Sequence, residues 1–490
     1  MLAGIRQRLA ILSAALLLAA ASLRLFRLDH FSYGLDEILQ AYWIQGSWEF
    51  FWRSLKFDAI HPPLDYLVVR FLEAADPADW GRKIPAVVWG LGTIVSAGAL
   101  LARRAGGTAG FTGAALLAFA PFHVRYSQEL RPYSLGLFLL CLSLLALEFF
   151  LARPGRLRLA LLFLSTLATA YALYLAALVL GIAAYALLAE DAFSTDPPRR
   201  LVARRSLAWS PLFLALLFVA YLPWWPTVLE AARRPPFAEA PPWTWERLAR
   251  LLSFFAFAPD DGQPLGRKGP LFLVMLAAGL ALALRRRGLR FLAAWAAGGF
   301  LAIEILGRLH PHYDFSRRFL PAGLAFPFLA ALPLAALLEK KRLRPLGAFL
   351  LALVLVFDLR SLALYYREGR ADWRTLADFL RRAAAPEERI FTENQYSQLC
   401  VAFYLVGPHW LFRGGRGGRE VLNLEGELIR LTWSWYPKKR AWLILAGEPV
   451  HPPTRQWAQG FPSFSFPKAE GAVAKRLDPE LREASLGLAR

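Results

Sequence analysis

The chain alternates between long apolar stretches and short polar segments that are rich in arginine. Runs of about 17 to 20 nearly uninterrupted apolar residues recur, and this is the length that a helix needs to cross the hydrocarbon core of a bilayer. They predict an all-α polytopic membrane protein with eleven membrane-spanning helices. The expected spans are residues 9–26, 84–102, 108–123, 134–151, 158–171, 173–190, 207–225, 269–284, 290–306, 319–338 and 345–363.

Basic clusters between the spans predict the orientation of the chain. They fall on one side of the predicted topology, at 6–8, 103–104, 153–158, 199–205, 285–287 and 340–344. Short cytoplasmic loops of membrane proteins are enriched in Lys and Arg, so this side is expected to be cytoplasmic. The stretch 158–190 has basic clusters at both ends. It is therefore expected to form two short helices joined within 169–174, because one long helix would invert everything after it.

The loops on the opposite side are expected to be extracytoplasmic, and they contain all seven histidines. The first of them, residues 27–83, contains two segments, 35–44 and 63–72, that mix apolar, aromatic and charged residues at helical spacing. This pattern predicts helices that lie in the membrane interface.

Beyond residue 364 the pattern changes. Residues 372–382 have the spacing of an amphipathic helix, 389–392 and 441–446 resemble buried strands, and turns rich in Gly and Pro separate them. The sequence therefore predicts a membrane domain, residues 1–363, and a small extracytoplasmic α/β domain, residues 364–490.

Composition supports the membrane class. Hydrophobic residues make up 57% of the chain, and the formal net charge is +20. In a soluble protein that charge would indicate nucleic acid, but here the arginines lie in short clusters between apolar runs, so no nucleic-acid partner is expected. Cys141 in an apolar run and Cys400 in a polar region predict neither a disulfide nor a cysteine-based metal site.

Three polar motifs lie in the extracytoplasmic loops. Asp36-Glu37 follows the first span, His61-Pro-Pro-Leu64 lies later in the same loop, and Arg125-Tyr-Ser-Gln-Glu-Leu-Arg-Pro-Tyr133 follows the third span. Charged side chains are costly near hydrocarbon, so polar groups gathered where spans end predict a shared site at the membrane surface.

In this order the motifs resemble those of the GT-C glycosyltransferases that use polyprenyl-phosphate sugars. Two further segments extend the resemblance, Arg317-Arg-Phe-Leu-Pro321 before a late span and Asp372-Trp-Arg374 beyond the last one. The similarity is to the branch of protein O-mannosyltransferases and lipid A aminoarabinose transferases, and it covers about residues 1–405. One departure is Ala170 before Tyr171, where relatives often have a basic residue.

The resemblance implies a fold and an activity. The fold would be of the GT-C type, in the cytoplasmic membrane of a bacterium or archaeon, with the active site outside the cell. The activity would be transfer of a monosaccharide from a polyprenyl-phosphate donor to a glycan, lipid or protein acceptor, with inversion at the anomeric carbon. A lipid-linked sugar flippase or transporter without transferase activity is the alternative, although transporters commonly carry polar residues at mid-membrane.

The resemblance also assigns roles to residues. Asp36 aligns with the acidic residue that relatives place after the first span, which makes it the expected catalytic base; Glu37 would assist it or contact the acceptor. The alternative is that both are solvated loop charges or a helix cap. The residues expected to bind the substrates lie in the loop motifs and are His61, Arg125, Tyr126, Gln128, Glu129, Arg131, Tyr133, Tyr171, Arg317 and Arg318.

Among these residues, Arg131, Arg317 and Arg318 are the expected ligands of the donor phosphate, because a guanidinium can bind two phosphate oxygens. Arg125 and Glu129, four residues apart, either bind the phosphate as a unit or form a structural ion pair. A divalent metal ion (Mg²⁺, Mn²⁺ or Zn²⁺) is a further expectation, with His61, Glu129, His310 and His312 as its candidate ligands.

Overall fold

The computed structural model describes two compact units. The residues it describes are 2–73, 79–234, 242, 244–257, 269–309, 316–368, 372–385, 388–392, 395–407, 421–423, 441–445, 463–466 and 472–477. The first unit comprises Met1–Phe26, Leu55–Asp76 and Gly81–Tyr365, and the second comprises Arg27–Ser54, Pro77–Trp80 and Tyr366–Arg490. Part of the long first loop thus groups with the C-terminal segment, and the proposed domains 1–363 and 364–490 stay a prediction.

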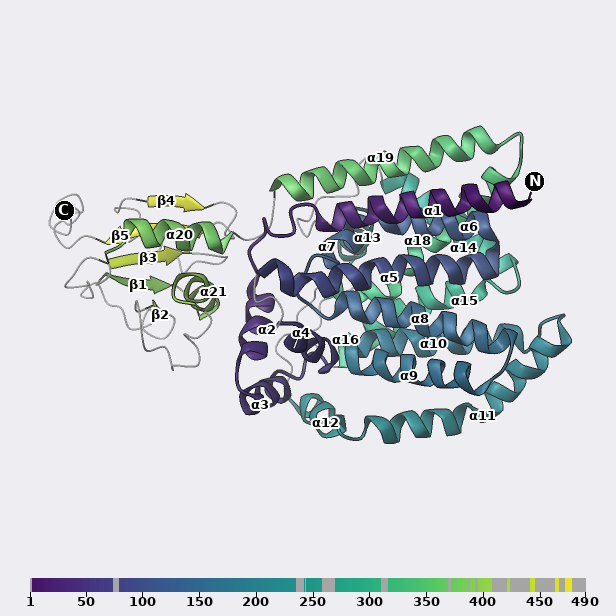
Figure 1. The fold of residues 1–490 in the computed structure, drawn as a ribbon, viewed down its shortest axis with the longest axis horizontal. Coiled ribbons are helices and arrows are strands. Elements are labelled where there is room, and N and C mark those ends of the chain that lie inside the picture. Colours follow the sequence, from purple (N-terminus) through teal and green to yellow (C-terminus); the bar gives the residue numbers. More distant parts are fainter. Residues whose placement is uncertain are drawn as a thin grey trace. The chain divides into compact units, whose positions relative to one another are not determined.

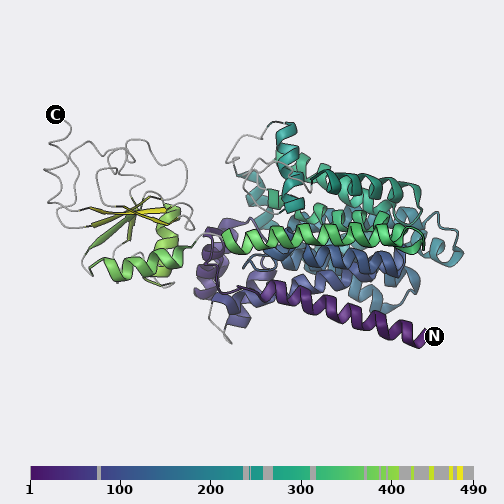
Figure 2. The same ribbon diagram turned by 90° about the horizontal axis from the view of Figure 1, so that it is seen from above.

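The first unit is helical, and its long helices run side by side in Figures 1 and 2. Its helices are α1 (Leu2–Leu25), α4 (Leu64–Glu73), α5 (Asp79–Ala105), α6 (Gly107–Phe119), α7 (Pro121–Tyr126), α8 (Tyr133–Ala152), α9 (Arg156–Ala172), α10 (Tyr174–Asp191), α11 (Pro197–Tyr221), α12 (Trp225–Arg233), α13 (Trp245–Phe257), α14 (Gly269–Arg285), α15 (Arg290–Ala293), α16 (Gly299–Leu309), α17 (Leu320–Gly323), α18 (Ala325–Glu339) and α19 (Arg344–Glu368).

This is a multi-pass membrane protein. Within the described residues, six helices are long and apolar enough to cross a bilayer, or seven if the bent pair Ser316–Gly323 and Ala325–Glu339 forms one span. Shorter apolar helices coincide with three more of the expected spans. The full number of eleven spans therefore stays a prediction.

Breaks in the helices fall at identifiable residues. The expected break within 158–190 is confirmed, since Leu173 is extended between α9 and α10. The expected span 319–338 is instead bent by 44° between α17 and α18. Pro327 explains the bend, because its ring removes a backbone donor and crowds the carbonyl four residues earlier, at Gly323.

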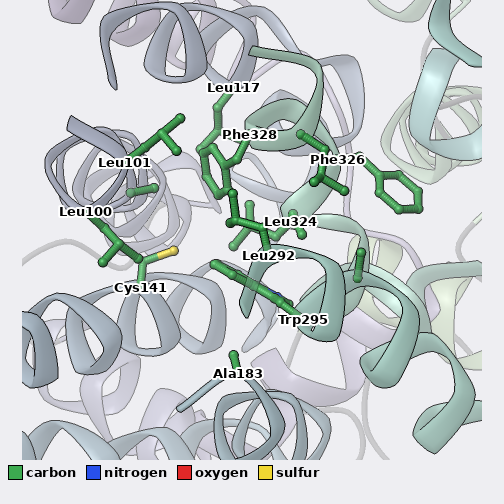
Figure 3. Close-up of a cluster of buried hydrophobic side chains, with 14 of the residues drawn as sticks. Leu100, Leu101, Leu117, Cys141, Ala183, Leu292, Trp295, Leu324, Phe326 and Phe328 are labelled. Atoms are coloured by element: carbon green, nitrogen blue, oxygen red, sulfur yellow. The ribbon is translucent and has the colours of Figure 1, made fainter. Parts of the chain in front are cut away.

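The core of the first unit is apolar and closely packed. Figure 3 shows Trp295, Phe328 and Leu324 meeting side chains of other helices. Trp295 lies in a π-helical turn, Ala294–Gly298, and its indole N–H donates to the Pro321 carbonyl over 2.7 Å. At Gly279 of α14 an added Cβ would lie 2.0 Å from the carbonyl oxygen of Leu329, so only glycine permits this approach of α14 to α18.

An ion-pair network joins four helices of the first unit at one end. Arg104 of α5 binds both carboxylate oxygens of Asp191 on α10, each over 2.9 Å. The Glu148 carboxylate of α8 contacts Arg104 at 2.5 Å and Arg199 of α11 at 2.6 Å. Arg199 also contacts Asp191 at 2.8 Å. Several arginines expected only to orient the chain therefore also hold its helices together.

The second unit contains helices and one mixed sheet. Its elements are α2 (Leu35–Gln45), most of α3 (Trp48–Asp58), α20 (Trp373–Ala383), α21 (Gln395–Leu405), β1 (Arg389–Thr392), β2 (Val421–Asn423), β3 (Ala441–Leu445), β4 (Ser463–Phe466) and β5 (Ala472–Leu477). The strand order is β2-β1-β3-β5-β4, with β1 parallel to β2 and β3, and β5 antiparallel to β3 and β4. The expected helix 372–382 and both expected strands are confirmed.

The Asp372-Trp-Arg374 motif ties the separate segments of the second unit together. Asp372 caps α20 by accepting from the Thr375 amide, while the Trp373 amide donates to the Ser32 hydroxyl over 3.0 Å. Arg374 binds the carboxylate of Asp79 at 3.0 Å. The motif therefore anchors the first-loop segments to the C-terminal segment.

Candidate functional site

His61 lies in the turn before α4, and its imidazole is buried. Neither ring nitrogen forms a hydrogen bond with any described residue. Burial, with the positive charges of Arg131 and Arg317, lowers the pKa of His61 well below its ordinary value. A neutral imidazole with two nearby guanidinium groups, brought together from three separate loops, is suited to bind an anion.

Aromatic rings surround this histidine. The His61 ring meets the Tyr133 ring edge to face, with centroids 5.5 Å apart, and Tyr133 meets Tyr126 at 5.2 Å. Tyr126 in turn packs on Phe254 of α13 at 6.1 Å. The structure thus gathers His61, Tyr126, Arg131, Tyr133 and Arg317 in the first unit, and their role in a substrate site stays a prediction.

Arg125 and Glu129 form the ion pair that their spacing predicts, with Nε and Oε1 3.2 Å apart. Helix α7 ends at Tyr126, so the pair bridges a turn rather than two steps of one helix. The contact agrees with the structural reading of the pair.

Gln128 binds the protein backbone. Its amide nitrogen donates to the carbonyls of Arg24 at 2.8 Å and Phe26 at 3.0 Å, and its carbonyl accepts from the Tyr365 hydroxyl at 3.1 Å. The side chain is buried. These contacts hold the loop after α7 against the ends of α1 and α19.

Arg24 holds the loop that carries the Arg125–Tyr133 motif, although it belongs to none of the sequence motifs. It is fully buried, and its guanidinium contacts His123 Nδ1 at 2.7 Å, Ser127 Oγ at 3.3 Å and the Ala118 carbonyl at 3.0 Å. The available signal was an arginine at the end of the first span, on the side where orientation does not require one.

Arg318 has different surroundings from Arg317. Its guanidinium packs over Gly307, where an added Cβ would lie 3.1 Å from one of its nitrogens. Close by in the chain, Glu304 of α16 binds Arg247 of α13 through two contacts of 2.8 and 2.9 Å, and it contacts Arg308 at 3.2 Å. Glu304 inside an expected span is therefore satisfied by an arginine from a loop helix.

Tyr171 joins two helices. Its hydroxyl donates to the Ala220 carbonyl of α11 over 3.0 Å, and its ring lies 4.7 Å from that of Tyr221. A role of Tyr171 in substrate binding stays a prediction.

Asp36 and Glu37 belong to the first turn of α2, in the second unit. Glu37 is buried and accepts from the Gly34 amide over 3.0 Å, which caps the helix. Asp36, one position earlier, is partly exposed. Tyr42 on the same helix meets Phe403 of α21 edge to face at 5.2 Å, which fixes α2 within the unit.

The expected metal site stays a prediction, because only two of its four candidate ligands, His61 and Glu129, lie in the described residues. The described residues contain no group of three or more His, Cys, Asp or Glu side chains that could hold a metal ion. His310 and His312 lie outside the described residues. At His61 the charges of Arg131 and Arg317 oppose a cation, so this position fits a metal poorly.

Comparisons with known proteins identify the fold. No model of a protein family and no curated protein sequence matches the chain. Among solved structures, ArnT from Cupriavidus metallidurans is similar in its apo state, with a TM-score of 0.53, 12% identity and coverage of 98% of this chain and 99% of that one. The same protein bound to undecaprenyl phosphate gives 0.52, 13%, 96% and 98%.

A second structure has the same kind of similarity. The archaeal oligosaccharyltransferase AglB from Archaeoglobus fulgidus, in complex with an inhibitory peptide and a dolichol-phosphate, has a TM-score of 0.52 and 10% identity. The match covers 97% of this chain and 75% of AglB. At these identities the likeness concerns the fold, and the fold of this multi-pass chain resembles that of the GT-C membrane glycosyltransferases.

Proposed function

We propose that the protein is a membrane glycosyltransferase that moves a monosaccharide from a polyprenyl-phosphate donor to an acceptor hydroxyl on the extracytoplasmic face. The observation that carries the proposal is the group formed by His61, Arg131 and Arg317 in a fold of the GT-C type. ArnT and AglB, which have that fold, were solved with undecaprenyl phosphate and with a dolichol-phosphate.

In the proposed reaction Asp36 is the general base. Its carboxylate takes the proton of the acceptor hydroxyl while the acceptor oxygen forms a bond to the anomeric carbon. The bond from that carbon to the phosphate oxygen breaks, and its electron pair leaves with the polyprenyl phosphate. Attack opposite the leaving group inverts the anomeric carbon.

Arg131 and Arg317 hold the phosphate in this proposal. Negative charge grows on the phosphate as the bond breaks, and guanidinium groups positioned in advance stabilise it. The neutral His61 can donate a hydrogen bond to a phosphate oxygen without adding a charge.

The rival function is a flippase or transporter of lipid-linked sugars. It also needs a phosphate site, but it needs no base. Purified protein should therefore be incubated with a panel of polyprenyl-phosphate sugars and acceptors, and the products identified by mass spectrometry. Free polyprenyl phosphate released together with a glycosylated acceptor supports the transferase, whereas movement of intact donor across vesicles without release supports the rival.

Replacing Asp36 tests the assigned base. Asp36→Asn keeps the shape of the side chain and removes its basicity, so turnover should fall by about 10² to 10⁴ while donor binding is kept. Glu37→Gln should be milder, because its amide oxygen can still accept from the Gly34 amide. The reverse ranking of the two variants would move the role of base to Glu37. Near-normal turnover of Asp36→Asn would mean that the Asp36 carboxylate is only a solvated charge at the start of the helix and not the base.

A further inference from the structure

An apolar slot lies between α8, α9, α10 and α11. Its volume is about 590 Å³, within the range of cavities that hold whole small ligands. Helix α11 forms one wall, and only 6% of its most apolar segment is buried within the protein. Figure 1 shows α11 along the edge of the first unit beside α9.

The walls of the slot offer almost no hydrogen bonds to a ligand. Thr166 donates to the carbonyl of Leu162, and Ser206 donates to that of Val202, both within their own helices. The Tyr185 hydroxyl donates to Ser210 over 2.9 Å. The remaining lining is largely aliphatic and aromatic, so the body of the slot is suited to hydrocarbon.

The two ends of the slot differ. At one end Tyr171 and Tyr221 join α9 to α11 through the contact of their tilted rings and through hydrogen bonds from their hydroxyls to backbone carbonyls. At the other end Arg205 contributes to the lining, and among the described residues of the lining it alone carries a charge. The arginine pattern assigns this second end to the cytoplasm.

Arg205 is available to a ligand. It is exposed and makes no hydrogen bond or ion pair with any residue that the structure describes. Its neighbours are engaged, since Arg199 binds Glu148 and Asp191, while Arg204 donates to the Ala192 carbonyl. The apolar slot suits the acyl chain of an acidic lipid, and the cation at its mouth suits the anionic headgroup.

We propose that this slot binds one acidic phospholipid of the cytoplasmic leaflet, with its acyl chain between α9 and α11 and its headgroup phosphate at Arg205. The site is separate from the proposed donor site, because its joined end faces the extracytoplasmic side and its charged mouth faces the cytoplasm. The bound lipid fills the gap behind α11 and holds that helix to the bundle.

Gly181 provides a direct test. It lies on α10 in the wall of the slot, and an added Cβ would meet no atom within 4 Å. Gly181→Leu should therefore narrow the slot without disturbing the packing, and it replaces a weak helix former by a strong one. Gly107→Leu is the matched control, since Gly107 has the same open surroundings but lies outside the slot.

The full-length protein is reconstituted in phosphatidylcholine nanodiscs that contain a minor fraction of phosphatidylglycerol, and the lipids retained after extraction are counted by native mass spectrometry. The wild type and Gly107→Leu should retain about one phosphatidylglycerol per chain, and Gly181→Leu should retain almost none. Arg205→Glu should weaken retention by roughly fivefold or more, as expected for a basic residue at an anionic headgroup. Arg286→Glu, an exposed change on the same side, should not.

Two results would overturn the proposal. One is equal retention of phosphatidylglycerol and phosphatidylcholine by the wild type, which would mean ordinary bilayer lipid. The other is unchanged retention in Arg205→Glu, a surface variant that does not depend on how Gly181→Leu folds. Neither readout requires transferase activity, so the result is independent of the proposed function.

Discussion

At the scale of residues, Arg317 and Arg318 are neighbours in the chain but have different surroundings. The positive charge of Arg317 lowers the pKa of His61, as that of Arg131 does, whereas Arg318 packs over Gly307. Arg131→Ala and Arg317→Ala should each weaken donor binding by one to two decades, because a hydrogen bond to a charged group contributes about 1.5 to 3 kcal/mol. Arg318→Ala should weaken it less. Arg317→Lys keeps the positive charge but cannot bind two phosphate oxygens at once, so it should give an intermediate loss of donor affinity.

The measurement is binding of a polyprenyl-phosphate sugar to each variant in nanodiscs. If the three alanine variants and their combination all bind like the wild type, these arginines are interface anchors and the phosphate binds elsewhere.

His61 should make stability depend on pH. In the unfolded chain a histidine has a pKa of about 6.5, whereas burial and the two arginine charges lower the pKa of His61 in the folded protein. As the pH falls below about 6.5, the unfolded state binds a proton that the folded state lacks. Stability should therefore fall, by up to about 1.4 kcal/mol per pH unit for this group.

His61→Phe should remove that contribution and keep the edge-to-face contact with Tyr133, since the imidazole nitrogens bind no described residue. Thermal unfolding between pH 5 and 7.5 should show that the melting temperature of the variant falls less steeply toward acid pH. Donor binding should also weaken in His61→Phe and stay unchanged in His30→Phe, a change at an exposed position. The same loss of melting temperature toward acid pH in the wild type and in His61→Phe would contradict the lowered pKa of His61.

The sequence predicted which loops gather at the site but gave no sign of several contacts that hold it. His61, Arg131 and Arg317 could be chosen because each is costly beside hydrocarbon. The partners of Arg24 could not be predicted, because Ser127 and His123 are about 100 residues away in the chain and meet it only when the helices pack. Local periodicity carries no information about such pairs.

At the scale of elements, α13 shows how a loop helix is fixed to the bundle. Arg247 on one turn binds Glu304, and Phe255 packs where an added Cβ at Gly323 would lie 2.1 Å from its ring. The docking could not be predicted, because it depends on a buried carboxylate in another helix.

Removing Arg247 should destabilise this arrangement. Arg247→Met leaves the buried Glu304 carboxylate beside the partly exposed Arg308, and breaking a buried pair typically costs about 3 to 5 kcal/mol. Arg247→Met combined with Glu304→Leu should cost less than the sum of the single changes. Arg250→Met, at an exposed position of the same helix, is the control. If the melting temperature of the double variant falls by the sum of the two single shifts, Arg247 and Glu304 do not stabilise the protein through their interaction.

The break between α9 and α10 was predictable, whereas other helix ends were not, since α11 begins at Pro197 and its span was expected from residue 207. The break at Leu173 follows from arginine clusters at both ends of one apolar stretch, and α10 begins one residue beyond the expected start. The bend after Gly323 was not predicted, although Pro327 was visible in the sequence. Proline within a membrane helix can be accommodated by its neighbours, so its presence alone does not locate a bend.

At the scale of the whole molecule, the arginines at one end of the spans serve two purposes. Their position predicts orientation, and reporters fused after residue 191 should be cytoplasmic, while those near residue 240 and at the C-terminus should be extracytoplasmic. A cytoplasmic C-terminus would mean that 158–190 crosses the membrane once. The structure adds that Arg104 and Arg199 are bound by Asp191 and Glu148.

Arg104→Lys separates the two roles. Lysine keeps the charge, so the reporter pattern should not change, but it cannot bind both oxygens of Asp191 while contacting Glu148. The variant should therefore lose about 1.5 to 3 kcal/mol of stability. Arg286→Lys, an exposed change on the same side, should alter neither reporter nor melting temperature. If Arg104→Lys melts like Arg286→Lys, the network adds nothing to stability, and these arginines act on orientation alone.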